Sequence, residues 1–370
     1  MFTYYPSVRF KQGERYALYR MPQDMKRHVE PRLIAPPIKE YDPELGRIPT
    51  LDEVIYLTGE RIGKHWPIGR AFLDLSFIAD EVGEVGIKRI LELAQIRNQE
   101  IVPVATLRDL QNPSLRDVRG KGKIKLAVLV GYEEVEVESV RNALKEAGLD
   151  ASDCVIFLDF KGAPLKPEIA AGAVASIFDT ANEIGRWQRI VFQASNFPSK
   201  NPAGHGESVL IPRDEWSAFH AAMLECGVAP ERVGYGDFAA DSSEIKFPKK
   251  KKKGGGGRAI RHLRYATATH WFVVRAQSEG CDADLMRDVC QRISNSVHYE
   301  GRSFSYADNR IFLVGQAKVG PGTASMWREW NTLHHITRVV RDLGAMAGVQ
   351  FADRPVIEEP EQQLLFPLNA

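Results

Sequence analysis

The sequence has few cysteines, and none of them form a paired motif. The four cysteines, Cys154, Cys226, Cys281 and Cys290, include no CxxC spacing, and no histidine pair completes a zinc-finger pattern. This excludes a disulfide-dense secreted scaffold and is typical of free thiols in a reducing compartment. The chain also lacks a run of about 18 apolar residues, and charges interrupt its N-terminal segment, so neither a membrane span nor a signal peptide is predicted. We therefore expect a cytoplasmic protein with no membrane partner.

An excess of charge of one sign is also missing. The 370 residues carry 49 lysines and arginines against 48 acidic residues, a formal net charge of +1. Attraction to DNA or RNA must therefore come from local basic patches. The clearest is FPKKKKKGGGG at 247–257, which predicts a loop that is either a solvated tip or a contact with phosphates. The nucleic-acid candidates are Lys249, Lys250, Lys251, Lys252, Lys253, Arg258 and Arg261.

Long alternating strands are scarce, but short apolar runs rich in Val, Ile and Phe recur. Several are apolar almost throughout, as in strands buried on both faces of a parallel sheet, and helical patterns separate many of them. This order predicts a (β/α)8 barrel of the triosephosphate isomerase type, with an open doubly wound sheet as the alternative. No GxGxxG follows the first run, which weakens a dinucleotide-binding interpretation. The eight runs are 4–10, 32–38, 71–77, 100–106, 123–130, 154–160, 189–195 and 232–238.

The barrel is expected to carry an insertion after its eighth strand. The segments 261–277 and 303–316 alternate like antiparallel strands, and 282–297 between them has a helical pattern. A long helix then closes the barrel. The predicted organisation is 1–239 for the eight strands and their helices, 240–315 for the insertion, 316–350 for the final helix and 351–370 for a flexible tail.

Several segments, in their order along nearly the whole chain, resemble the beta family proteins of bacteria and their prophages. They include YYPSVRFKQGERYAL at 4–18, PRLIAPPIKE at 31–40, GYGDF at 234–238, RYATATHWFVVRA at 264–276 and WREWNTLHHIT at 327–337. The resemblance implies a barrel-like α/β fold and an association with mobile elements and phage–host conflict. It supplies no specific activity, so the site must be argued from the residues themselves.

Charged side chains gather at the predicted C-terminal ends of the strands, where barrel enzymes place their chemistry. Oxygen ligands suit a divalent cation such as Mg2+, and guanidinium and ammonium groups suit a phosphate. Together they would suit phosphodiester hydrolysis. Structural ion pairs that cap the core are the competing interpretation. The candidates are Glu40, Asp74 and Asp237 as metal ligands, Arg9, Lys11 and Arg264 as a phosphate clamp, and Asp74, Asp237 and His270 as catalytic groups, with His270 as general acid.

Two further features lie near the C-terminus. Neighbouring positions on a helix point about 100° apart, so we expect one of His334 and His335 to pack inward and the other to face the surface. The segment QQLLF resembles the peptide by which bacterial proteins dock on the replication sliding clamp. Gln362 would be its polar anchor, and Leu365 and Phe366 would fill an apolar pocket. Alternatively, these residues fold back onto the barrel.

Two classes of function therefore remain. No GxSxG, HExxH or phosphate-binding glycine loop is present. This favours a non-catalytic binding or sensing protein of phage–host conflict, either antiviral or prophage-encoded, that docks to nucleic acid or a replication protein. The alternative is a metal-dependent barrel hydrolase that acts on a phosphodiester or nucleotide.

Overall fold

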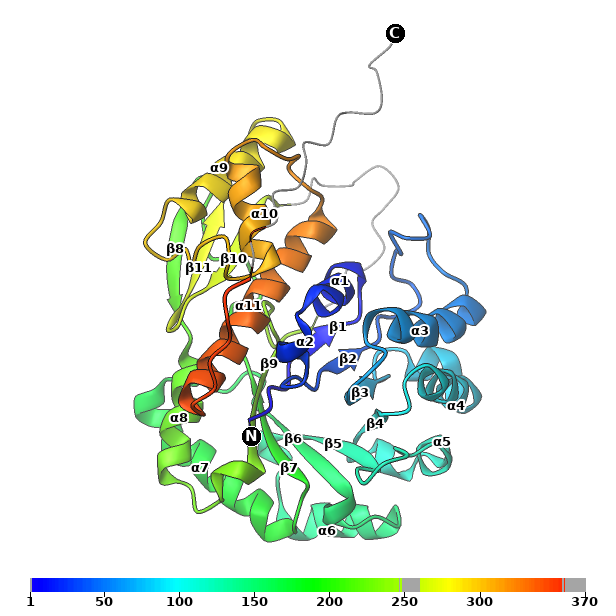
Figure 1. Cartoon of the computed structure of the whole chain (residues 1–370). Coiled ribbons are helices and arrows are strands. Elements are labelled where there is room, and N and C mark those ends of the chain that lie inside the picture. Colours follow the sequence, from blue (N-terminus) through cyan, green and yellow to red (C-terminus); the bar gives the residue numbers. More distant parts are fainter. Residues whose placement is uncertain (1, 246, 248–259, 355, 357–370) are drawn as a thin grey trace.

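The computed structural model describes residues 2–245, 247, 260–354 and 356 (Figure 1). Eight parallel strands form one sheet, in which sequence neighbours pair in order from β1 to β7 and β9 follows β7. Tyr4 then bridges to Tyr235 on β9, and the Tyr5 N–H donates to the Tyr235 carbonyl over 2.9 Å, which nearly closes the ring. The predicted barrel is confirmed and the open sheet is wrong. Its strands are β1 Ser7–Arg9, β2 Arg32–Ile34, β3 Ala71–Asp74, β4 Ile101–Thr106, β5 Leu126–Gly131, β6 Cys154–Asp159, β7 Arg189–Ala194 and β9 Val233–Asp237.

The apolar runs become barrel strands because both of their faces are buried. On β6, Val155 and Phe157 point into the barrel, where they pack with Tyr5 and Phe72. Their neighbours Ile156 and Leu158 belong to the layer between the sheet and the helices. Such strands have no polar face, which is why their sequences do not alternate.

Helices cover the outside of the barrel. Several begin at recognisable signals, such as the Thr50 and Glu53 capping box of α3 and the N-terminal proline of α7. The helices are α1 Gln12–Arg20, α2 Gln23–Lys26, α3 Leu51–His65, α4 Ala79–Arg97, α5 Pro113–Asp117, α6 Val137–Glu146, α7 Pro167–Ile184, α8 Asp214–Glu225 and α11 Ala324–Met346. Among the described residues, none of the helices has the length and apolar character required to cross a membrane.

A small antiparallel sheet sits beside the barrel mouth, against the upper half of α11 in Figure 1. Its hairpin, β10 His262–Ala266 and β11 His270–Arg275, and the following helix α9 Asp282–Ser294 confirm the predictions for these segments. The third strand is β8 Ser208–Pro212, which comes from the connection between β7 and α8 and pairs with β11.

The segment 303–316, predicted to be a strand, is instead the helix α10 Tyr306–Gly315. Ser305 caps it by accepting a hydrogen bond from the Asp308 N–H over 3.2 Å. Ala307, Ile311 and Val314 are buried at helical spacing, and this spacing outweighs the short alternation that suggested a strand.

Candidate functional site

Three arginines meet at one carboxylate beside the barrel mouth. Arg9 ends β1, Arg264 lies on β10 and Arg328 lies on α11, and all three contact Asp241, which follows β9. The Arg264 and Arg328 Nη1 atoms lie 3.0 and 2.9 Å from Asp241 oxygens, and Arg9 also forms an ion pair with it. We call this group the arginine cluster. Segments far apart in the chain build it, so the closed barrel and α11 must both be in place.

The arginine cluster has more positive than negative charge. Glu14 lies 3.7 Å from Arg9 and 3.9 Å from Arg328, and Lys11 pairs with Glu40 over 2.6 Å. Among the described residues, the cationic groups of Arg9, Lys11, Arg264 and Arg328 lie beside the carboxylates of Glu14, Glu40 and Asp241. Such a concentration of cationic groups favours an anion.

The pKa shifts follow this arrangement. Burial alone would raise the pKa of Asp241, but the charges of Arg328, Arg9 and Arg264 outweigh it and hold that pKa well below its usual range. Burial, and then the neighbouring charge of Arg328, lower the pKa of Arg264 to about 10. The same two causes lower the pKa of Arg9. For Arg328, in contrast, burial would lower the pKa, but the charges of Asp241 and Glu14 outweigh it and raise the pKa. Burial and mutual repulsion thus disfavour the charges of Arg9 and Arg264, whereas Asp241 stabilises that of Arg328.

A cavity of about 320 Å3 opens next to the arginine cluster. Two helices begin at its wall: α1 at Gln12 and α11 at Ala324. Among the described residues, no side chain caps the start of α1. Uncapped N–H groups and the positive end of the helix dipole favour an anion at α1. The start of α11 contributes its dipole, while the Thr323 hydroxyl already accepts a hydrogen bond from the Met326 N–H over 3.4 Å. The cavity is lined by Arg9, Lys11, Gln12, Gly13, Glu14, Pro43, Ala324, Ser325 and Arg328.

The three carboxylates predicted to bind a metal each contact a different residue. Glu40 pairs with Lys11, and both Nε and Nη2 of Arg32 donate to one oxygen of Asp74, over 2.9 and 2.6 Å. In the part of the chain that the structure describes, no group of three His, Cys, Asp or Glu side chains is arranged to hold a metal ion. The metal roles of Glu40, Asp74 and Asp237 therefore stay predictions, and each would require a carboxylate to leave its present partner.

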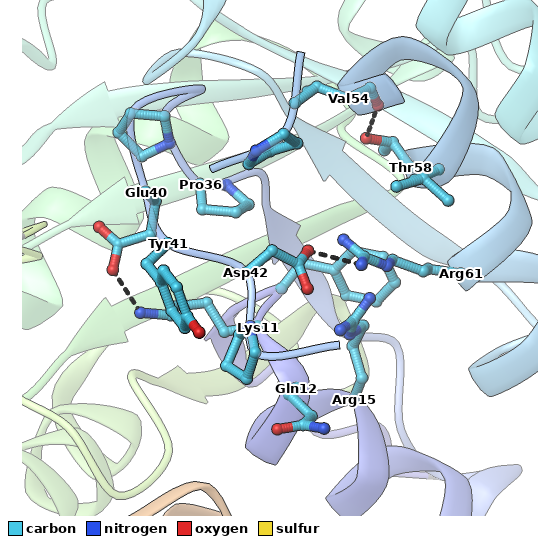
Figure 2. A pocket seen from close by; sticks show the side chains of 15 residues that line it. Lys11, Gln12, Arg15, Pro36, Glu40, Tyr41, Asp42, Val54, Thr58 and Arg61 are labelled. Carbon is cyan, nitrogen blue, oxygen red and sulfur yellow. Dashed lines mark hydrogen bonds and ion pairs between the residues drawn. The ribbon is translucent and has the colours of Figure 1, made fainter. Parts of the chain in front are cut away.

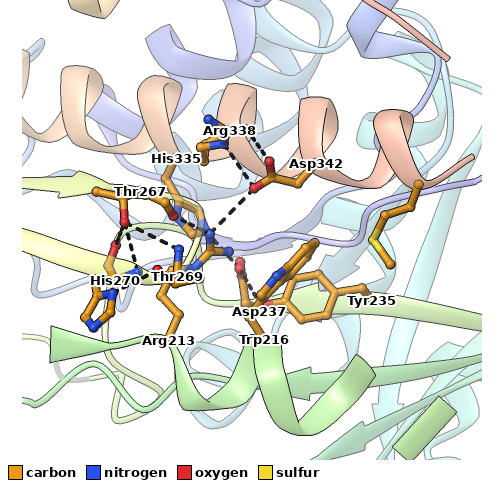
Figure 3. Close-up of polar contacts among 12 residues, drawn as sticks. Arg213, Trp216, Tyr235, Asp237, Thr267, Thr269, His270, His335, Arg338 and Asp342 are labelled. Atoms are coloured by element: carbon orange, nitrogen blue, oxygen red, sulfur yellow. Dashed lines mark hydrogen bonds and ion pairs between the residues drawn. The ribbon is translucent and has the colours of Figure 1, made fainter. Parts of the chain in front are cut away.

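Asp237 is the centre of a fully buried network (Figure 3). It accepts hydrogen bonds from the Tyr4 hydroxyl, from the Tyr235 hydroxyl over 3.2 Å, from the Ala239 N–H over 2.8 Å and from His335 Nε2 over 2.8 Å. Burial would raise its pKa, but His335 and the hydrogen bonds outweigh this and lower it. Asp237 itself is 1% exposed, so it has no open path to a ligand.

Both neighbouring histidines of α11 are buried, so the expectation that one faces the surface is wrong. His335 stacks on Trp271, with ring centroids 4.6 Å apart, and its Nε2 contacts Asp237 at the end of the barrel strand β9. His334 contacts Asp308 over 3.1 Å and the Ala266 carbonyl over 2.8 Å. The reason is that α11 is packed between the barrel and the small sheet with α10, so two of its faces are covered.

The other predicted residues lie elsewhere. His270 is at the start of β11, where its Nδ1 is 2.9 Å from the Thr269 hydroxyl (Figure 3), and it is not joined to Asp74 or Asp237. Arg261 is 9% exposed and pairs with Asp282. Outside the described residues lie Lys249, Lys250, Lys251, Lys252, Lys253, Arg258, Gln362, Leu365 and Phe366.

The sequence did not single out Arg328 or Asp241. No spacing joins them to Arg9, because they come from a helix near the C-terminus and from the loop after the last barrel strand. The only available signal was that Arg328 lies within WREWNTLHHIT, one of the segments that carry the family resemblance.

The sequence model of the family described as Beta protein matches residues 4–341, nearly the whole chain. The chain belongs to the Beta protein family. The match includes every member of the arginine cluster, both helix starts at the cavity and the buried Asp237–His335 pair. No curated protein matches this chain.

Proposed function

We propose that this member of the Beta protein family is a binding protein that holds a phosphate-bearing anion in the cavity beside the arginine cluster. The observation that carries the proposal is the convergence of Arg9, Lys11 and Arg328 with the starts of α1 and α11 on one cavity. Guanidinium groups and helix N-termini both favour phosphate oxygens, and the cavity has room for a phosphate or diphosphate group.

The carboxylates at the strand ends are already engaged by neighbouring side chains, which favours a binding function over hydrolysis. A general base or metal ligand needs a carboxylate that can reach the substrate. Asp74 is engaged by Arg32, Glu40 by Lys11, and Asp237 is enclosed by its own donors. A metal-dependent hydrolase built on these three carboxylates would need their present contacts to open.

The wider role rests on the family resemblance. We propose that anion binding serves recognition of nucleic acid or a nucleotide during phage–host conflict, in the cytoplasm. The four free cysteines, two of them buried, support a reducing compartment. The lysine run 249–253 as a contact to DNA or RNA, and Gln362, Leu365 and Phe366 as a contact to the sliding clamp, stay predictions.

Isothermal titration calorimetry with inorganic pyrophosphate tests the proposal. We expect the wild-type protein to bind and Arg328→Gln to bind about 10- to 100-fold more weakly, the usual effect of losing a charge-assisted hydrogen bond. Binding should also weaken as salt is added. The matched control is Arg287→Gln, because Arg287 is half-exposed on α9 and pairs only locally with Asp284 over 3.2 Å. No binding by the wild type, or an equal loss in both variants, would reject the proposal.

A further inference from the structure

A second, smaller pocket adjoins the anion cavity (Figure 2). It has a volume of about 50 Å3 and lies between the start of α1, the segment 36–43 and α3. Lys11, Gln12 and Pro43 line both the pocket and the cavity, so the two are direct neighbours. Its apolar wall consists mainly of Phe10, Pro36, Pro37, Tyr41, Pro43 and Pro49.

Arg15 presents unsatisfied donors in this pocket. It is 1% exposed, and its Nη2 donates to Glu44 over 2.9 Å. Its Nε and Nη1 atoms have no hydrogen-bond partner among the described residues. These donors can hydrogen-bond to a ligand that brings an acceptor into the pocket.

The charges in the pocket indicate that this acceptor is neutral. Arg61 pairs with Asp42 over 2.5 Å and with Glu44 over 3.1 Å, so the two arginines already face two carboxylates (Figure 2). A further carboxylate or phosphate would unbalance this group. A carbonyl oxygen would accept from Arg15 without adding charge.

We propose, as an extension of the proposed function, that the ligand is a nucleoside phosphate whose base carries ring carbonyl oxygens. The phosphate lies in the cavity near Arg9 and Arg328, and the base enters the pocket, where a carbonyl accepts from Arg15 and the ring contacts Tyr41 and the prolines. A pocket of about 50 Å3 admits only the carbonyl-bearing edge of a base, while the rest of the ring lies at the rim against the exposed Tyr41. A single ring fits this arrangement better than a fused pair, which points to a uracil-type base.

The test compares uridine 5′-diphosphate, adenosine 5′-diphosphate and inorganic pyrophosphate by isothermal titration calorimetry on the full chain. We expect the uridine nucleotide to bind at least tenfold more tightly than either of the others, because adenine has two rings and no ring carbonyl. Tyr41→Ala should reduce the affinity for the uridine nucleotide to about that for pyrophosphate and leave pyrophosphate binding unchanged. Tyr41 is 56% exposed, so this variant should keep its fold.

Tyr56→Ala is the control, since Tyr56 is similarly exposed on α3 but does not line the pocket. Equal binding of uridine diphosphate and pyrophosphate, or an equal loss in both tyrosine variants, would overturn this inference and leave the proposed anion site standing. A wild-type protein that binds none of the three would overturn both.

Discussion

At the scale of single residues, Asp237 is held by donors from three separate segments. Tyr4 precedes β1, Tyr235 and the Ala239 N–H lie on and after β9, and His335 belongs to α11. Ala239 takes a φ of 49°, a left-handed conformation that few residues other than glycine adopt. That conformation aims its N–H at the Asp237 carboxylate. The network therefore joins the first and last strands of the barrel to the helix α11.

Asp237→Asn should lower the free energy of unfolding by about 3 kcal/mol, because the new amide presents N–H groups to donors in a fully buried site. Urea denaturation measures this change. Asp284→Asn serves as a control, because the Asp284 side chain is 68% exposed. A change below about 0.5 kcal/mol for Asp237→Asn would contradict the structural role and reopen the catalytic one.

Glu215 is completely buried beside Arg213, which is buried as well. Burial raises the pKa of Glu215 from 4.5 to about 7, although the charge of Arg213 acts in the opposite direction. The folded state thus holds this proton more tightly than the unfolded state. The stability that Glu215 contributes is present below about pH 4.5 and is lost as the pH rises through 7.

Glu215→Gln removes this titration. Relative to the wild type, the variant should gain about 3 kcal/mol of unfolding free energy between pH 4.5 and pH 8, in line with the size of the shift. Thermal melts of both proteins across this range measure the difference. Parallel stability profiles would show that Glu215 does not titrate as described.

At the scale of elements, α1 and α11 approach closely at Gly13. A Cβ atom there would lie 2.5 Å from the Ser325 carbonyl oxygen and 2.8 Å from the Arg328 Cβ. The absence of a side chain is what brings the two helix starts to the same cavity. Arg328 is placed by the same contact.

Gly13→Ala should therefore destabilise the protein by about 1–3 kcal/mol and weaken pyrophosphate binding, even though alanine favours a helix. Gly172→Ala on α7 is the matched control, since its Cβ would meet only Glu225 Oε2 at 3.4 Å. That variant should be neutral or slightly more stable. Chemical denaturation measures the stability of both variants, and calorimetry measures their pyrophosphate binding. Equal stability and equal binding in the two variants would contradict the account.

The elements could be predicted wherever one local pattern decided them. The eight barrel strands are short apolar runs with both faces buried, and α11 has a long amphipathic pattern. The segment that became α10 carries both a short alternation and the helical spacing of Ala307, Ile311 and Val314, and the alternation was followed instead of the spacing. Strand β8 could not be predicted, because its partner β11 lies about 60 residues later and supplies the pairing.

At the scale of the whole molecule, the candidate site depends on closure of the strands into a barrel and on the packing of α11 beside α1. The sequence suggested Arg9, Lys11 and Arg264 as a phosphate clamp, and the structure brings Arg9 and Arg264 to one carboxylate, with Lys11 at the same cavity as Arg9. Arg328 and Asp241 could not be predicted, because only the packing of α11 against α1 and the small sheet brings Arg328 to the loop after β9 that carries Asp241. Strand-end position alone also did not reveal that Asp237 lies within a fully buried network.

The central claim is that the cavity beside the arginine cluster binds a phosphate-bearing anion. Its most direct test is calorimetric unfolding of the wild type and of an Arg9→Gln, Arg328→Gln double variant, each with and without pyrophosphate at 100 times the wild-type Kd. Binding to the folded state should stabilise the wild type by about 2.7 kcal/mol, a rise of a few degrees in Tm, and leave the double variant unchanged. An unchanged wild-type Tm, or an equal rise in the double variant, would contradict the claim.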